Sequence, residues 1–265
     1  PHHLLDMNLE VYFVDSFTKK VFSGNAAGVV FHSGELTAST MQNIAFENNL
    51  SKTAFVDTNK SNEIKFYSPE VEVDLCGHAT LASAFVYFNF INEEANEIIF
   101  NSNRGQLVAK RKDDAIVMSL PKDQPERESD LDMFIDALGC DVREVYKGID
   151  DYLAVLEDED TVKNLIPDID KIANMPSRGL IVSAKGKEVD FVSRVFGPNV
   201  GVDEDPVTGS AHALLATYWA SMLGKNDLTA RQLSKREGSL HCSVKEDTVE
   251  ITGHAVLYLR GTIEV

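Results

Sequence analysis

The 265-residue sequence predicts an α/β fold of the α+β kind, built from two similar domains. Each half of the chain carries a turn of small residues followed by an apolar helix: "DLCGHATLASAFVYF" from residue 74 and "EDPVTGSAHALLATYWA" from residue 204. Strand-like runs precede and follow each helix. A helix that is apolar on nearly every side is buried. We therefore expect each helix to lie inside a curled sheet.

The two stretches align when Gly77 is placed on Gly209, an offset of 132 residues. At this offset similar residues coincide: Glu72 with Glu204, Cys76 with Thr208, His78 with Ser210, Ala79 with Ala211 and Ala84 with Ala216. A similar succession of strands, helix and strands surrounds both stretches. This repetition indicates an internal duplication that gives two similar domains.

The polar segment 121–130, with two prolines and six charged residues, is predicted to link the domains. The predicted domains are residues 7–121 and 130–265. As an alternative, the last strand of the chain belongs to the first domain. Further helices are expected from Thr37 to about residue 48, at 131–138, and at 161–173 with a break at Pro167. Residues 1–6 precede Met7 and are interpreted as a tag remnant.

Composition excludes several classes of function. The net charge of −17 argues against binding to nucleic acid or to an anionic membrane, and it also serves solubility. No run approaches the ~18 apolar residues of a membrane span. The three cysteines are widely spaced without a CxxC pair, which favours a reducing, cytoplasmic location and argues against a zinc or disulfide framework. Phosphate-binding loops, HExxH and GxSxG are absent, and we expect no cofactor and no metal.

The two helix starts are candidate anion sites. The first amides of a helix have no partners within the helix, and glycine lets a ligand approach the backbone closely. Gly77 and Gly209 would therefore hold a carboxylate or an oxyanion. The alternative is ordinary capping, in which Asp74 on one side and Asp205 or Thr208 on the other satisfy these amides.

Four stretches carry a family resemblance: "VDSFTKKVFSGNAAGVV", "IAFENNLSKTAFV", "EVDLCGHATLASAFV" and "GVDEDPVTGSAHALLATYW". They resemble the PhzF-like (phenazine biosynthesis) isomerase family, which shares its fold with diaminopimelate epimerase. The resemblance implies two domains, each a mostly antiparallel sheet wrapped around a central helix, with the active site in the cleft between them. It further implies a cofactor-independent isomerase of a small anionic metabolite, active as a homodimer.

The resemblance also assigns roles to residues. Glu47 in "AFENN" matches the family's acid/base glutamate, and a proton-transferring carboxylate is expected to be partly shielded from water. The other matched positions line the cleft or lie near the substrate: Asn25, Cys76, Gly77, His78, Asp205, Gly209 and Ser210. Among these, His78 and Asp205 are counted with Glu47 as catalytic.

The chain departs from the family pattern at several positions. Lys52 stands where glutamate is usual, Ala26 where proline is usual, and Glu237 replaces a glycine. These changes leave the substrate open. The epimerase relatives use a cysteine at each helix start, but here Thr208 stands at the position of the second thiol. A threonine hydroxyl is too weak an acid or base for that role.

Two hypotheses for the function stay open, together with a third that is disfavoured. The first is a cofactor-free isomerase that works by proton transfer. The second is a catalytically idle protein that binds a metabolite or a partner through the same cleft. The third, a cysteine-based racemase, is disfavoured by Thr208. For individual residues, Glu47 as a surface carboxylate, His78 as a core or capping histidine and Asp205 as a cap are the structural alternatives.

Overall fold

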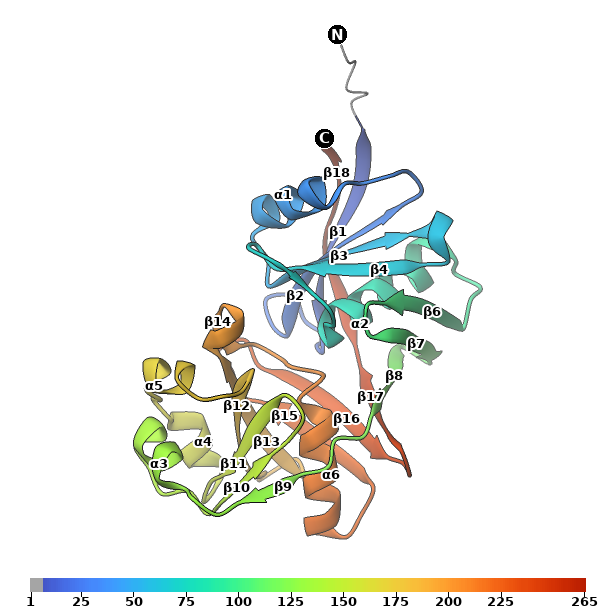
Figure 1. Ribbon diagram of the computed structural model, residues 1–265. Coiled ribbons are helices and arrows are strands. Elements are labelled where there is room, and N and C mark those ends of the chain that lie inside the picture. Colours follow the sequence, from blue (N-terminus) through green and yellow to red (C-terminus); the bar gives the residue numbers. More distant parts are fainter. Residues whose placement is uncertain (1–6) are drawn as a thin grey trace. The chain divides into compact units, whose positions relative to one another are not determined.

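The computed structural model describes residues 7–265; the interpreted tag remnant, residues 1–6, lies outside the described residues. The chain divides into two compact units (Figure 1). The N-terminal unit contains residues 7–118 and 253–265, and the C-terminal unit contains residues 119–252. The predicted linker, 121–130, is not all loop, because it contains the short strand β9 (Glu126–Glu128).

The N-terminal unit is a sheet with two α-helices. Its strands are β1 (Asn8–Ser16), β2 (Asn25–His32), β3 (Lys52–Asp57), β4 (Glu63–Tyr67), β5 (Glu72–Val73), β6 (Glu97–Ser102), β7 (Gly105–Lys112), β8 (Ala115–Pro121, which runs past the boundary of the unit) and β18 (Ala255–Glu264). Its helices are α1 (Ala38–Asn48) and α2 (Gly77–Val86), with a 3-10 turn at Thr58–Lys60 and a π-helical turn at Tyr87–Ile91.

The C-terminal unit contains a sheet and four α-helices. Its strands after β9 are β10 (Glu144–Lys147), β11 (Asp151–Val155), β12 (Gly179–Lys185), β13 (Phe191–Gly197), β14 (Val202–Asp205), β15 (Asp227–Gln232), β16 (Gly238–Val244) and β17 (Thr248–Gly253). Its helices are α3 (Asp132–Leu138), α4 (Glu159–Asn164), α5 (Ile169–Ala173) and α6 (His212–Leu223), with a 3-10 turn at Pro198–Val200.

Strand pairing repeats between the units. In the N-terminal unit β1–β2 is antiparallel, β2–β3 parallel, β3–β4 and β4–β5 antiparallel, β4–β6 parallel and β6–β7 antiparallel. Strands β10 to β16 pair in the same succession of directions. In the chain, α2 lies between β5 and β6, and α6 lies between β14 and β15. The predicted internal duplication is therefore confirmed.

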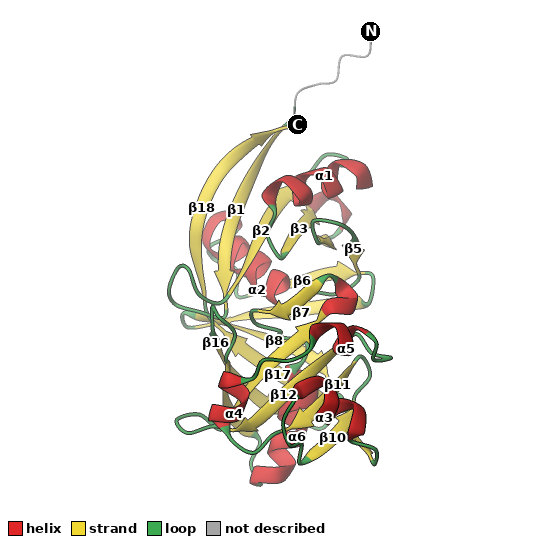
Figure 2. Ribbon diagram, turned by 90° about the vertical axis from the view of Figure 1, so that its left-hand side faces the viewer, coloured by secondary structure: helices red, strands yellow, loops and turns green. Residues whose placement is uncertain are grey.

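Helix α2 is buried on almost every side, and of its ten residues only Phe85 lacks a buried position. It packs against β1, β2, β3, β7 and β18. Close approach of the chain just ahead of β18 depends on Gly253, the last residue of β17, because a Cβ there would lie 2.5 Å from Phe17 and 3.1 Å from Leu81 of α2. Strand β18 pairs along the whole of β1, and Figure 2 shows the two strands side by side. The N-terminal unit is thus a sheet curled around α2, as expected.

Helix α6 occupies the equivalent place in the C-terminal unit. Trp219 donates its indole N–H to Ser183 Oγ on β12 at 2.9 Å and stacks on Phe191 of β13. Tyr218 donates its hydroxyl to Glu144 of β10 at 3.0 Å. Contacts with several strands around the helix show that this sheet also curves around its helix.

The opposite faces of the two sheets are covered by shorter helices. In the N-terminal unit Met41 and Ile44 of α1 pack on Val30 and Phe55. In the C-terminal unit α3, α4 and α5 lie on one side of the strands and α6 on the other (Figure 1). Each sheet therefore has a buried helix on one face and one or more covering helices on the other, and the predicted fold class is confirmed.

Truncating a side chain of α2 should show that its burial stabilises the unit. Leu81 is fully buried, and the change Leu81→Ala should cost about 3 kcal/mol through the lost transfer energy and the cavity. The matched control is Leu259→Ala on β18, where the side chain is 40% exposed and the cost should be about 1 kcal/mol or less. Urea unfolding of the three proteins measures both values. Equal losses would contradict the buried position of α2.

Candidate active site

Five predicted or neighbouring residues form what we call the N-terminal cluster: Asn25, Lys52, Cys76, Gly77 and His78. Asn25 is the first residue of β2 and Lys52 is the first residue of β3. These strands are parallel, so both residues lie at the same end of the sheet. Cys76 immediately precedes α2, and the other two are its first residues. The parallel pairing and the start of α2 therefore bring these side chains together.

The Nδ1 atom of His78 contacts two neighbouring side chains. Asn25 Nδ2 lies 3.3 Å from His78 Nδ1, and Cys76 Sγ lies 3.2 Å from the same nitrogen. Where both of these groups donate to Nδ1, the proton of the neutral ring lies on Nε2. This buried Nε2 has no hydrogen-bond partner among the described residues.

His78 is held in its neutral form. Burial, and after it the positive charge of Lys52, lower its pKa from 6.5 to about 3, although a hydrogen bond to the backbone of Ala26 partly opposes this shift. At neutral pH the ring therefore carries one proton and no charge. A neutral imidazole with a protonated Nε2 can donate a hydrogen bond to a bound oxygen atom.

The capping alternative for α2 is wrong. Cys76 occupies the N-cap position, and no side chain makes a capping hydrogen bond there. Asp74 instead accepts a hydrogen bond from Asn103 Nδ2 at 3.1 Å. The side chain that could have capped this helix is thus engaged on a neighbouring loop.

Glu47 lies in the last turn of α1 and is exposed. The end of this helix is held in place, since Asn48 Nδ2 donates to Thr53 Oγ1 at 3.2 Å. A Cβ at Gly28 would lie 3.0 Å from Thr53 Oγ1 and 3.1 Å from Asn48 Nδ2, so glycine permits this packing. Asn49, at a left-handed φ of 50°, ends the helix. The structure therefore fixes the backbone around Glu47, while the expected shielding of its carboxylate is not seen within this unit.

The C-terminal cluster consists of Asp205, Thr208, Gly209, Ser210 and Arg178. Thr208 donates its hydroxyl to Asp205 Oδ2 at 2.5 Å. Gln232 on β15 braces this pair, because its Nε2 donates to the Asp205 carbonyl and its Oε1 accepts from the Thr208 amide. The hydroxyl at the position of the second thiol is thus a fixed donor to a carboxylate, which supports the conclusion that Thr208 is no base.

Arg178 connects Ser210 to a buried carboxylate. Its Nε and Nη2 contact the two carboxylate oxygens of Asp151 at 3.0 and 2.5 Å, and Nη2 also donates to Ser210 Oγ at 3.3 Å. Burial disfavours the charged guanidinium, but Asp151, with Asp150 and Asp205, outweighs this effect and raises the pKa of Arg178. Ser210 is therefore oriented by a rigid, bidentate ion pair.

The start of α6 differs from the prediction. The helix begins at His212, whereas Gly209 and Ser210 lie in a preceding turn in which the His212 amide donates to the Gly209 carbonyl. Its N-cap, Ala211, has no polar side chain, so capping of the preceding amides by Asp205 or Thr208 stays an alternative here. The hydrogen bonds among Thr208, Asp205 and Gln232 hold the chain just ahead of this turn.

His212 has a structural environment. Its Nδ1–H donates to the Thr208 carbonyl at 2.8 Å, and its ring packs near Phe191. Burial lowers its pKa to about 4, opposed by the bond to Thr208. It stabilises the turn that carries Gly209 and Ser210, so these contacts give it a structural role.

Sequence reasoning missed the partners of the C-terminal cluster. Arg178 and Asp151 are separated by 27 positions, and only the pairing of β11 with β12 brings their neighbourhoods together. No sequence motif indicates that Gln232 is a partner of this cluster. A charged residue at the start of a fully buried strand, as in "DYLAV", was the one available signal for Asp151.

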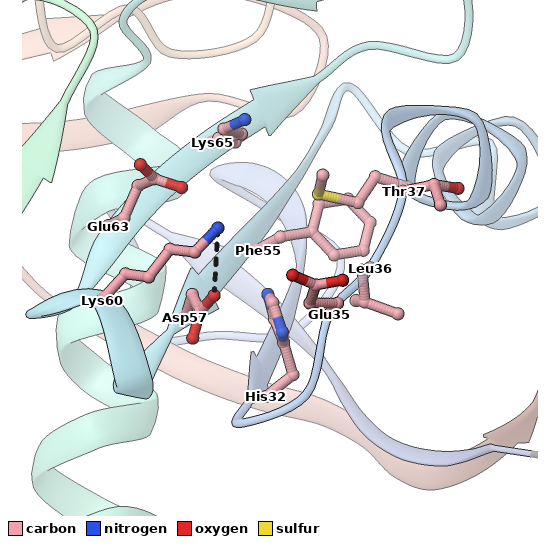
Figure 3. A pocket seen from close by; sticks show the side chains of 10 residues that line it. His32, Glu35, Leu36, Thr37, Phe55, Asp57, Lys60, Glu63 and Lys65 are labelled. Carbon is pink, nitrogen blue, oxygen red and sulfur yellow. Dashed lines mark ion pairs between the residues drawn. The ribbon is translucent and has the colours of Figure 1, made fainter.

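A separate cavity of about 200 Å³ lies at the other end of β2 and β3. Figure 3 shows His32, Asp57 and Lys60 among its lining side chains, and Lys60 Nζ lies 3.9 Å from Asp57 Oδ2. It contains none of the predicted site residues. Within residues 7–265 no group of three or more His, Cys, Asp or Glu side chains is placed to hold a metal ion. Of the helices in the same residues, none is both long and apolar enough to cross a membrane.

Comparison with known proteins identifies the family. A sequence profile described as phenazine biosynthesis-like protein matches residues 14–261. An uncharacterized isomerase of Pseudomonas aeruginosa is 44% identical over 260 residues, 98% of this chain and 100% of that protein. A solved PhzF-family phenazine biosynthesis protein of Enterococcus faecalis has a TM-score of 0.93 at 43% identity, over 97% of this chain and 99% of that one.

The chain belongs to the phenazine biosynthesis-like family. Several relatives in this family are named isomerases, so the predicted enzyme class is confirmed. A hydroxyproline epimerase of Agrobacterium vitis matches with a TM-score of 0.63 at 8% identity, covering 97% of this chain and 93% of that one. This match shows a shared epimerase-like fold alone.

Replacing Arg178 should show how much an unpaired, buried carboxylate destabilises the protein. The Arg178 and Asp151 side chains are 29% and 6% exposed, and Arg178→Leu should cost about 3–5 kcal/mol because Asp151 is left buried without its partner. The double change Arg178→Leu, Asp151→Leu should recover most of this loss. Arg143→Leu, which breaks a surface pair with Glu157, is the control and should cost less than about 1 kcal/mol. Urea unfolding gives all four values, and a double variant no more stable than Arg178→Leu would contradict the pairing.

The neutral His212 predicts how stability depends on pH. Its folded pKa of about 4 lies below its unfolded value of about 6.5, so the unfolded state binds the proton more readily. This contribution is complete above pH 6.5 and is lost as the pH falls toward 4. Between pH 7 and pH 5 the original protein should lose about 2 kcal/mol more than His212→Gln, because glutamine does not titrate. Urea midpoints at both pH values test this, and equal losses would show that folding does not lower the pKa of His212.

Proposed function

We propose that the chain is a cofactor-independent isomerase that moves a proton between two carbons of a small anionic metabolite, with Glu47 as acid and base. Family membership supports the isomerase class, and the match of "AFENN" to the family's glutamate motif supports the residue. The proposed substrate contacts residues of both units, as the resemblance implies. A homodimer and a cytoplasmic location, implied on the same grounds and by the free cysteines, stay predictions.

The proposed chemistry needs no group other than a carboxylate. Glu47 removes a proton from a carbon next to a carbonyl, carboxyl or conjugated system, and the electron pair of the broken C–H bond delocalises into that system. Protonated Glu47 then returns the proton to another carbon of the same system, and the carboxylate is restored. A bound substrate would supply the shielding that the exposed Glu47 lacks.

The other site residues are assigned supporting roles in this proposal. His78, neutral and protonated on Nε2, donates to a substrate oxygen. Asp205 and Ser210, held by Thr208 and Arg178, orient the substrate, and Asp205 is the second candidate for a proton relay. The backbone amides at Gly77 and Gly209 stabilise negative charge that develops during the transfer.

The observation that carries the proposal against a thiol mechanism is the hydrogen bond from Thr208 to Asp205. It shows a hydroxyl donor where a second reactive thiol would stand. Cys242 cannot replace that thiol, because burial raises its pKa to about 12. Cys76 thus has no thiol partner for a paired acid and base mechanism within the described residues.

Hydrogen exchange in heavy water tests the proposal. The protein is incubated with pooled carboxylic-acid metabolites in deuterium oxide, and mass spectrometry identifies the metabolite that gains deuterium. Glu47→Gln keeps the shape but removes the base, so it should abolish exchange while binding weakens by no more than about tenfold, or 1.4 kcal/mol. Glu93→Gln, an exposed glutamate of the same unit, should leave exchange unchanged.

Cys76→Ser separates the carboxylate mechanism from the thiol mechanism. It should retain most of the exchange. Loss of exchange in Cys76→Ser together with normal exchange in Glu47→Gln would identify the thiol as the base. Binding of a metabolite without any exchange by the original protein would instead support an idle binding protein.

A further inference from the structure

Lys52 occupies a defined place beside His78. It begins β3 and aligns with Ala27 of the parallel strand β2. Side chains alternate along a strand, so Asn25 and Ala27 share a face, and aligned parallel neighbours point the same way. Because Asn25 contacts His78 of α2, Lys52 projects on the α2 face. The next residue, Thr53, contacts Asn48 of α1 on the opposite face, which agrees with this assignment.

The charge of Lys52 is not neutralised within the described residues. It makes no ion pair there, although it is half-buried and lies close enough to act electrostatically on His78. By contrast Lys60, just past the other end of β3, lies 3.9 Å from the Asp57 carboxylate. A partly desolvated cation without a counter-ion is costly unless an anion joins it.

The C-terminal unit has a similarly placed cation, and there the cation has a carboxylate partner. Strands β11 and β12 correspond to β2 and β3, and Arg178 immediately precedes β12. Arg178 contacts Ser210, the residue that matches His78 at the offset of 132. In that unit the cation is held by Asp151, a carboxylate of the chain itself. In the N-terminal unit the cation is present and the carboxylate is missing.

We propose that Lys52 and His78 form a binding site for a carboxylate that the ligand supplies. The Lys52 ammonium and the unpartnered Nε2 of His78, which this proposal takes as protonated, are then two donors, one charged and one neutral. Gly77 and His78 carry the first backbone amides of α2, and no side chain caps this helix. A carboxylate can accept from all three kinds of donor, whereas a cationic or purely apolar group satisfies none of them.

This inference deepens the proposed function, and it rests on that function only for the statement that the carboxylate belongs to the substrate. Lys52 then acts as a specificity-determining residue. It selects a ligand that carries an anionic group at the end held by α2, and its charge adds to the burial that keeps His78 neutral. Proton transfer by Glu47 is a separate step and needs no contribution from Lys52.

The test uses acetate as the probe and the full chain at pH 7. Backbone amide spectra are recorded during a titration with sodium acetate at constant total sodium, with chloride as the balancing anion. The Gly77 and His78 amides should shift and saturate, and nitrogen spectra should show His78 protonated on Nε2. Lys52→Gln should weaken the apparent acetate affinity about tenfold, Lys52→Glu should abolish the saturable shift, and Lys52→Arg should restore most of it.

Lys60→Gln is the matched control, because it removes one lysine charge from the same unit at the other end of β3. It should leave acetate affinity unchanged. Equal affinity in the original protein and Lys52→Gln would overturn the proposal, as would an equal weakening by Lys60→Gln, which would indicate only the overall charge. The amide spectra show whether each variant is folded. Loss of acetate binding in Lys52→Gln with unchanged deuterium exchange in Glu47→Gln would support this site and refute the proposed base.

Discussion

Each unit depends on the burial of a helix that has no polar face. Helices α2 and α6 can exclude water only if strands surround them, and this forces each sheet to curl. The polar groups of a buried helix then have to be satisfied at its ends. The N-cap residue of α2 makes no capping hydrogen bond, whereas the first amides of α6 donate to carbonyls of the turn that precedes it. The predicted site residues next to these helices lie at these two points.

The duplicated backbone carries different chemistry in its two copies. His78 and His212 are both buried and both neutral, yet Nδ1 of the first contacts the side chains of Asn25 and Cys76, whereas Nδ1 of the second donates to the Thr208 carbonyl. Cys76 and Thr208 precede the two helices, and the first lies beside an imidazole while the second donates to a carboxylate. The fold tolerates these differences because the strands, which carry the burial, pair in the same order in both units.

The sequence was most informative where hydrophobicity alone decides the structure. The helices at Gly77 and near Gly209 follow from apolar runs, and the end of α1 follows from the two asparagines at 48 and 49. Strand β15, "DLTARQ", was not predicted, because its inward residues include the small Ala230 and the polar Gln232, which give a weak alternation. The fully buried Gln232 is stabilised by hydrogen bonds to a loop that only the folded chain brings near.

The candidate site was predictable to the same limited degree. Motifs identified Asn25, Cys76 and His78 one by one, and the structure shows that the three are in contact. Long-range partners such as Arg178 with Asp151 leave no spacing pattern, since their separation in sequence is set by the loop and two short helices between β11 and β12. The start of α6 was placed three residues too early because the sequence does not reveal the network around Thr208.

The pairing of β1 with β18 has a consequence for how the protein is made. The C-terminal unit, residues 119–252, is continuous in the chain and can fold as soon as it leaves the ribosome. The N-terminal unit is translated first, but β1 keeps an unpaired edge until β18 emerges after the whole of the other unit. An unpaired edge strand invites association with other chains. During synthesis the N-terminal unit therefore emerges first but completes its sheet last. It is the unit that most needs protection by chaperones.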